Sequence, residues 1–234
     1  MPPEFIIAAG FYVVFLLSVT LHEAAHAWAA HRLGDDTAYL GGQVSLDPLP
    51  HIRREPFGMV VLPIVTVAWI GWPLGFAHAP YDPIWADRYP KRAAWMALAG
   101  PGANLALLVL AAVGLRAGLQ AGLFQPPSSL SYHTIAETAG SAVGRSLAIF
   151  LSLLFTENLL LLLFNLIPLP PMDGSAALAL FLPRDLNRQY TEFMAQPMMP
   201  VLGLFLAWIV FNRIFGPAYL ATIDLLYAGI AQYG

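Results

Sequence analysis

The stretch FIIAAGFYVVFLLSVTLHEAAHAWAA, residues 5–30, combines a long apolar run with three ionisable side chains near its end. A run of this length is sufficient for a helix that crosses the roughly 30 Å hydrocarbon core of a bilayer. It lacks a basic start and a small-x-small cleavage pattern, and it continues directly into His22 and His26. We therefore interpret it as a retained membrane helix rather than a signal peptide.

The composition of the whole chain agrees with a lipid environment. Of its 234 residues, 58% are hydrophobic and only 11% are charged, whereas soluble domains carry roughly a quarter charged residues. The net charge of -3 and the 11 Lys and Arg residues argue against nucleic acid as a partner. Because the chain has no cysteine, any metal must be bound by histidines and carboxylates.

The apolar segments predict an all-α polytopic membrane protein that forms a single membrane-embedded domain over residues 1–234. About four transmembrane helices are expected, near residues 5–30, 93–122, 145–168 and 197–216, with a weaker apolar run at 218–231. The segment 57–77 is interrupted by prolines and glycines, so it is either re-entrant or an additional span. Broken backbone at membrane depth requires cover by protein or a water-filled cavity.

The segment Tyr39–Asp47 lies between the first two apolar runs and is too short and too polar to cross a membrane. Its two glycines and the alternation that follows them predict a short β-hairpin near the active site. An exposed strand there would pair with an extended peptide and hold its backbone open.

The basic residues give the predicted orientation. If 57–77 enters and returns, eight of the 11 Lys and Arg residues fall on one side of the membrane, including the cluster at 88–92. Only Arg116, Arg145 and Arg213 fall on the other side. The positive-inside rule then places both chain ends outside and the cluster in the cytoplasm.

The sequence His22-Glu23-Ala-Ala-His26 predicts a metal site on the first helix. Residues four apart share one helix face, so both imidazoles can bind one ion. Glu23 is one step round the helix, which suits a general base for a water molecule activated by zinc. A chance match would have to explain three ionisable groups inside an apolar run, where each is costly.

A catalytic zinc site needs a third protein ligand, and Asp173 is the best candidate. It lies in NLIPLPPMDG, residues 165–174, directly after a long apolar run that the prolines end. Gly174 permits a tight turn that can aim the carboxylate inward. An ordinary helix-capping role for Asp173 is the alternative, and His51 and His78 are rival ligands that fit interfacial loops better.

Three further polar residues lie in apolar runs. Asn104, in the Gly100–Asn104 motif, either stabilises an oxyanion or forms an interhelical hydrogen bond at a packing kink, and the sequence favours neither. Asn165 borders the proline-rich break, where it can bond a free backbone group. Glu157 is an acidic residue within a span, and both a functional role and a structural pairing stay open.

These motifs, in this order on three apolar segments, resemble the site-2 protease family of intramembrane zinc metalloproteases. The runs RLGD at 32–35 and LDP at 46–48 resemble its compact bacterial branch, without PDZ or CBS domains. The resemblance implies one Zn²⁺ per chain and hydrolysis of peptide bonds within or beside the membrane. It also implies a multi-pass protein of the cell membrane whose active site faces the cytoplasm. The implied roles are metal ligation by His22, His26 and Asp173, base catalysis by Glu23, and support of the site by Asn104 and Asn165.

The expected partners are a transmembrane protein or peptide substrate and the lipid bilayer, and no oligomeric state is predicted. Two alternatives stay open at this stage. A metal-binding membrane protein without peptidase activity, such as a transporter or pseudoenzyme, would be expected to show an internal repeat or polar residues along several spans. A metal-dependent hydrolase of lipid-like substrates would use the same site chemistry.

Overall fold

The computed structural model describes residues 3–138 and 140–230, and it is built from helices. The elements are α1 (Pro3–Leu33), α2 (Thr37–Leu40), α3 (Pro48–Arg54), the π-helical turn η1 (Phe57–Val61), α4 (Leu62–Ile70), α5 (Pro83–Arg88), α6 (Pro90–Gln120), α7 (Ala142–Asn165), α8 (Asp173–Ala177), the 3-10 turn η2 (Leu178–Leu180), α9 (Arg184–Met194) and α10 (Met199–Tyr227). Four of them, α1, α6, α7 and α10, are long and apolar enough to cross a membrane. The predicted all-α class with about four membrane helices is confirmed.

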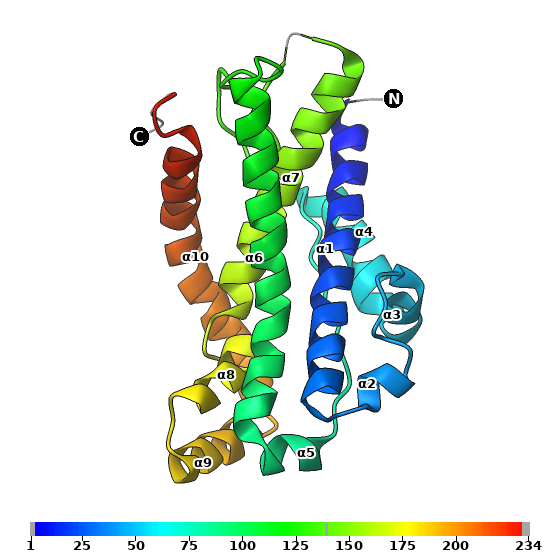
Figure 1. The fold of residues 1–234 in the computed structure, drawn as a ribbon, viewed down its shortest axis with the longest axis vertical. Helices are drawn as coiled ribbons and strands as arrows, with labels where there is room; N and C mark the ends of the chain where they lie inside the picture. Colours follow the sequence, from blue (N-terminus) through cyan, green and yellow to red (C-terminus); the bar gives the residue numbers. More distant parts are fainter. Residues whose placement is uncertain (1–2, 139, 231–234) are drawn as a thin grey trace.

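The long helices form one bundle (Figure 1). α6 packs against both α1 and α7, and α1 also contacts α7, so these three helices form the centre. Buried apolar side chains such as Leu115, Leu153 and Ile223 fill the core. α10 lies at the edge of the bundle, because only 22% of its most apolar stretch is buried, compared with 44–50% for the other three long helices.

The short helices α2, α5, α8 and α9 gather at one end of the bundle, the lower end in Figure 1. The start of α1 and the end of α10 lie at the opposite end. The loop that carries α8 also touches α10, because Gly203 of α10 lies directly against the backbone carbonyl of Pro170. A Cβ atom at position 203 would overlap that oxygen, so glycine allows this close approach.

The segment 57–77 folds into a hairpin of helix and extended chain beside α1. η1 and α4 together form an apolar helix, Phe57–Ile70, that is shorter than a membrane span. Gly71, with a φ of 78°, ends this helix in the left-handed region. The chain then returns, and the amide of Phe76 donates to the carbonyl of Gly58 over 3.1 Å. The chain therefore enters and leaves this hairpin at the same level of the bundle.

The predicted β-hairpin at Tyr39–Asp47 is wrong, because the described residues contain no β-strand there. The carboxylate of Asp35 accepts hydrogen bonds from the amide and hydroxyl of Thr37, which forms a local turn just before α2. The amides of Gly42 and Gln43 then bond back to carbonyls of α2. These donors are satisfied locally, so a partner strand is not needed.

Several helix boundaries differ from the expected ones by a few residues, and two of the differences involve prolines. α7 ends at Asn165 rather than near 168, because Pro168 lacks an amide hydrogen and disfavours helical backbone in the residue before it. α10 continues to Tyr227 with Pro217 inside it, so the weaker apolar run at 218–231 begins within the same helix.

Candidate metal centre

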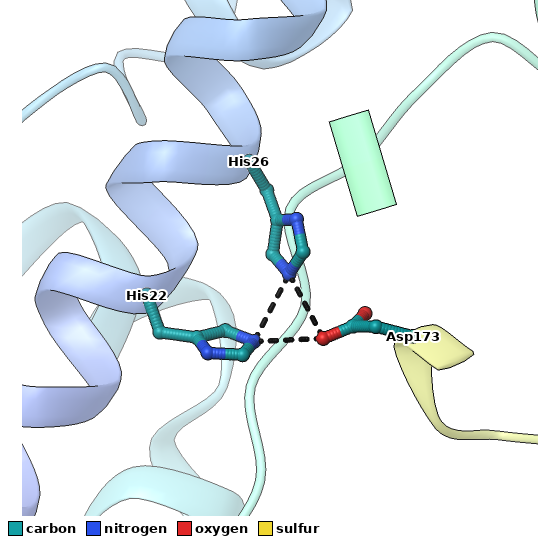
Figure 2. A group of neighbouring side chains, drawn as sticks. All are labelled: His22, His26 and Asp173. Carbon is teal, nitrogen blue, oxygen red and sulfur yellow. Dashed lines mark hydrogen bonds and ion pairs between the residues drawn. The ribbon is translucent and has the colours of Figure 1, made fainter. Parts of the chain in front are cut away.

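His22 and His26 lie one turn apart on α1 and point to the same side of the helix (Figure 2). Both side chains are buried. Their Nε2 atoms are 3.0 Å apart, and the two rings meet edge to face with centroids 4.6 Å apart. The i, i+4 spacing of the sequence therefore brings two imidazole nitrogens to one point, as the helix period predicts.

Asp173, the first residue of α8, reaches the same point from 147 residues further along the chain than His26. Its Oδ2 atom is 3.1 Å from Nε2 of His22 and 3.3 Å from Nε2 of His26 (Figure 2). Gly174 allows α8 to start this close to the preceding loop, because a Cβ atom at position 174 would lie only 2.6 Å from the carbonyl oxygen of Ile167. The structure thus brings together the three residues that the sequence singled out as ligands.

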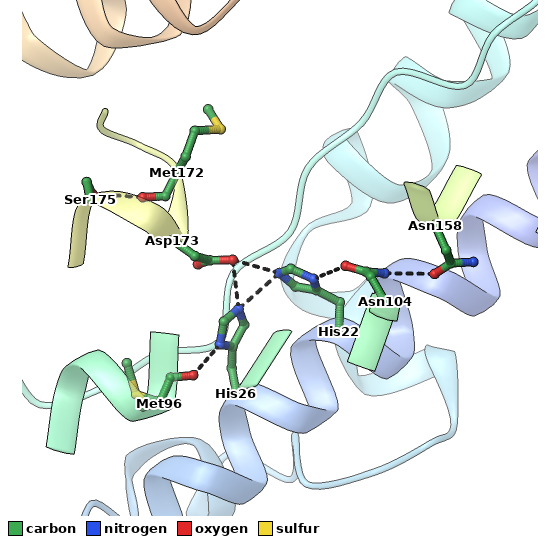
Figure 3. Close-up of polar contacts among 8 residues, drawn as sticks. All are labelled: His22, His26, Met96, Asn104, Asn158, Met172, Asp173 and Ser175. Atoms are coloured by element: carbon green, nitrogen blue, oxygen red, sulfur yellow. Dashed lines mark hydrogen bonds and ion pairs between the residues drawn. The ribbon is translucent and has the colours of Figure 1, made fainter. Parts of the chain in front are cut away.

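The hydrogen bonds of the imidazoles determine which nitrogens face inward (Figure 3). Nδ1 of His26 is 2.8 Å from the carbonyl oxygen of Met96, which can only accept, so Nδ1 carries the hydrogen. Nδ1 of His22 is 2.6 Å from Oδ1 of Asn104 and is a donor for the same reason. In neutral rings both Nε2 atoms then present lone pairs. Two lone pairs and a carboxylate oxygen that converge in this way can bind one cation between them.

The residues present fit a zinc ion. Two imidazoles and one carboxylate are a known ligand set of catalytic zinc sites, and bonds of about 2.0–2.1 Å place tetrahedral ligands about 3.3 Å apart. The three observed distances, 3.0, 3.1 and 3.3 Å, are close to this value. Within the described part of the chain, Oδ2 of Asp173 accepts no hydrogen bond. The carboxylate oxygen is therefore free to bind an ion.

Gly100 of α6 keeps this space open. A Cβ at position 100 would overlap Nε2 of His26 and lie 2.5 Å from Nε2 of His22. Only a residue without a side chain leaves room beside both nitrogens, which gives the predicted glycine motif a specific purpose.

The charge state of Asp173 also suits a ligand. Burial raises the pKa of its carboxyl group, but the attraction and hydrogen bonds of His26 and His22, when these rings carry a proton in place of a metal ion, outweigh burial and hold the pKa below its ordinary value. Asp173 is therefore a carboxylate at neutral pH.

Of the remaining predicted residues, Glu23 and Asn104 lie at the site, whereas no hydrogen bond joins Asn165 or Glu157 to the three ligands in the described part of the chain. Glu23 is buried next to the site, and its Oε2 atom has no hydrogen-bond partner among the residues that the structure describes. Asn104 contacts His22 directly. Asn165 is the last residue of α7, and its side chain makes no hydrogen bond to the three ligands in residues 3–138 and 140–230. Glu157 is buried in α7 outside the group.

The rival third ligands have other partners. Nε2 of His51 is 3.0 Å from the carbonyl oxygen of Ser45, and Nδ1 of His78 is 2.7 Å from a carboxylate oxygen of Glu55. Neither histidine belongs to the group around Asp173. The hydrogen bond between Met96 and His26 could not be predicted from the residue type, because the backbone carbonyl of Met96 forms it.

Two buried histidines on a membrane-length helix and a half-buried aspartate on α8 are a ligand set typical of a metalloprotein, and comparison with known proteins specifies the family. The chain matches the model of Peptidase family M50 over residues 10–210. It belongs to that family, which confirms the resemblance to site-2 proteases and identifies the chain as a zinc-dependent metalloprotease.

The curated relatives agree with this family. The chain is 29% identical to "Putative zinc metalloprotease YwhC" of Bacillus subtilis over 193 residues, 82% of this chain and 78% of the relative. It is 31% identical to "Putative zinc metalloprotease Rip2" of Mycobacterium tuberculosis over 215 residues, 90% of this chain and 73% of the relative. No solved structure gives a significant match.

Proposed function

We propose that this protein is an intramembrane endopeptidase that cleaves membrane-protein substrates within or next to the bilayer, with one zinc ion held by His22, His26 and Asp173. The observation that carries the proposal is the position of the donor group. His22 and His26 lie inside a candidate membrane span, Ile7–Leu33, and the ligands converge where α1, α6 and α8 meet. A peptide bond that reaches this point belongs to a substrate in the membrane or at its surface.

The orientation of the site follows from the charges around it. Arg88 ends α5, and Lys91 and Arg92 lie in the first turn of α6, at the same end of the bundle as α9. By the positive-inside rule this end faces the cytoplasm of a cell membrane. The ligands lie nearer this end of α1 than its start, so we propose that water and substrate reach them from the cytoplasmic side. In this orientation the hairpin at 57–77 is re-entrant.

The chemistry of the site follows from the positions of its side chains. When bound, a zinc ion polarises a water molecule and the carbonyl group of the scissile peptide bond. Glu23 takes a proton from the attacking water and later gives it to the leaving amine. Its buried Oε2 atom has no hydrogen-bond partner among the described residues, so it is available to accept that proton. Asn104 directs its carbonyl oxygen at His22, which favours support of a ligand over stabilisation of an oxyanion.

The direct test is the replacement Glu23→Gln, which keeps the shape of the side chain and removes its basicity. General base catalysis contributes about 10²–10⁴ to the rate. We therefore expect cleavage of a transmembrane substrate in detergent to fall by at least two orders of magnitude, with unchanged zinc content. Glu192→Gln, at an exposed ion pair with Arg188 on α9, is the matched control and should leave cleavage unchanged. Cleavage by the Glu23 variant at the rate of the parent would remove this residue from the reaction.

A further inference from the structure

We propose that Asn158 of α7 is a positioning residue that determines, through Asn104, which nitrogen of His22 faces the metal. The inference rests on the proposed zinc site. Both amide side chains are fully buried, with exposed fractions of 0%. They form a line of hydrogen bonds from α7 through α6 to the ring on α1 (Figure 3). Asn158 itself does not touch the three ligands.

The first step is the orientation of the Asn158 amide. Its Nδ2 atom lies 2.8 Å from the carbonyl oxygen of Leu154, one turn earlier on α7. A backbone carbonyl can only accept, so the amino group must face Leu154. The second hydrogen of this amino group points to the hydroxyl oxygen of Ser18, 2.9 Å away. A hydroxyl can donate or accept, so Ser18 stabilises the arrangement without determining it.

The second step passes this orientation to Asn104. With the amino group of Asn158 directed at Leu154, its Oδ1 atom faces α6 and accepts from Nδ2 of Asn104 over 2.9 Å. The carbonyl oxygen of Asn104 therefore faces the opposite way, toward Nδ1 of His22 at 2.6 Å. A reversed Asn104 would place its oxygen against Oδ1 of Asn158 and its amino group against the Nδ1 hydrogen of His22.

The third step is the effect on the metal ligand. Since Asn104 presents an acceptor, Nδ1 of His22 must carry the hydrogen, and the lone pair on Nε2 faces His26 and Asp173. If Asn104 were free to turn, it would also stabilise the other tautomer, whose lone pair faces Asn104 and whose hydrogen faces the metal position. Metal binding would then have to work against that tautomer in a buried site where water offers no substitute partner.

A different explanation is that these amides only hold α1, α6 and α7 together, as interhelical hydrogen bonds commonly do. The two explanations differ in one respect. A purely structural bond does not depend on which group Asn104 presents to His22. A positioning role requires that the side chain at position 104 has one donor group and one acceptor group, so that its orientation matters. An aspartate side chain at position 104 would have two acceptor oxygens, so it would need no orientation.

The experiment measures zinc affinity of metal-stripped protein in detergent, by competition with a chromophoric chelator. We expect Asn158→Leu to weaken zinc binding about 10–100-fold, the usual effect of losing a group that orients a metal-bound histidine. Asn158→Ala, which removes the same amide with less apolar bulk, runs in parallel in case the leucine variant does not fold. The control Ser18→Ala removes one bond of Asn158 but leaves the orienting carbonyl of Leu154, and it should change the affinity by no more than about twofold.

The same Asn158 replacements in an Asn104→Asp background decide between the explanations. For a positioning role, they should then cost almost nothing, because either oxygen of the introduced carboxylate accepts from His22. An equal loss in both backgrounds overturns the positioning role, and so does parent-like affinity of the single variants. If the unsubstituted protein binds no zinc at all, the proposed function fails, and the positioning role fails with it.

Discussion

Gly100→Ala is the substitution that most directly tests the geometry of the site. The added methyl group would overlap Nε2 of His26 and lie 2.5 Å from Nε2 and 2.6 Å from Cε1 of His22. Ordinary contacts of a Cβ atom begin at 3.4 Å, so the methyl is too close to the second ring by about 0.9 Å. It stands in front of the two atoms that would bind the ion.

The magnitude follows from what can move. α6 is packed between α1 and α7, and the rings are tied to Asn104 and to Met96 by short hydrogen bonds. Overpacking in such a core costs about 1–3 kcal/mol. If the strain is relieved by displacement of the imidazoles, the same energy appears as a loss of zinc affinity of roughly fivefold to 150-fold. We expect cleavage activity to fall at least as far.

The assay compares zinc affinity, cleavage of a transmembrane substrate and thermal unfolding for Gly100→Ala and Gly102→Ala. A Cβ at position 102, two residues along α6, would meet nothing within 4 Å. The control should bind zinc like the parent and be more stable by about 0.4–1 kcal/mol, because alanine restricts the unfolded chain more than glycine. Parent-like zinc affinity of the Gly100 variant would refute the close approach of α6 to the imidazoles.

Two further predictions concern the third ligand and the ion. Gly174→Ala would place a methyl group 2.6 Å from the carbonyl oxygen of Ile167, so α8 and Asp173 must shift and zinc affinity should fall. The control Gly216→Ala places its methyl group in open space and should leave zinc affinity unchanged. Equal affinities of the two variants would contradict this. Removal of zinc by a chelator should lower the unfolding temperature, and zinc at a hundredfold excess over its Kd should restore about 2.7 kcal/mol. An unfolding temperature that is the same with and without zinc would contradict the proposed zinc site.

The part of the site that depends on local geometry was predictable from the sequence. The spacing of His22 and His26 fixes a shared face on any helix, and proline placement marks where α7 ends within a few residues. Asp173 followed from chemistry rather than from geometry, since zinc needs a third ligand and Asp173 is an acidic residue on a proline-broken segment. Its approach to within 3.1 Å of His22 depends on the packing of the whole bundle.

What could not be predicted depends on long-range contacts or on the backbone. The Gly-Gly sequence at 41–42 fits a hairpin turn as well as the end of a short helix, and in the structure the amides of Gly42 and Gln43 bond back to α2. Asn158 stands out in an apolar run, but nothing in the sequence pairs it with Asn104 on another helix. The bond from His26 ends on a carbonyl group, which every residue possesses.

The contact between Gly203 and Pro170 joins the least buried of the four long helices to the segment that supplies the carboxylate ligand. A tilt that a thinner or thicker bilayer imposed on α10 would push against this loop or pull away from it. We therefore expect the position of Asp173, and with it the zinc affinity, to differ between short-chain and long-chain lipids.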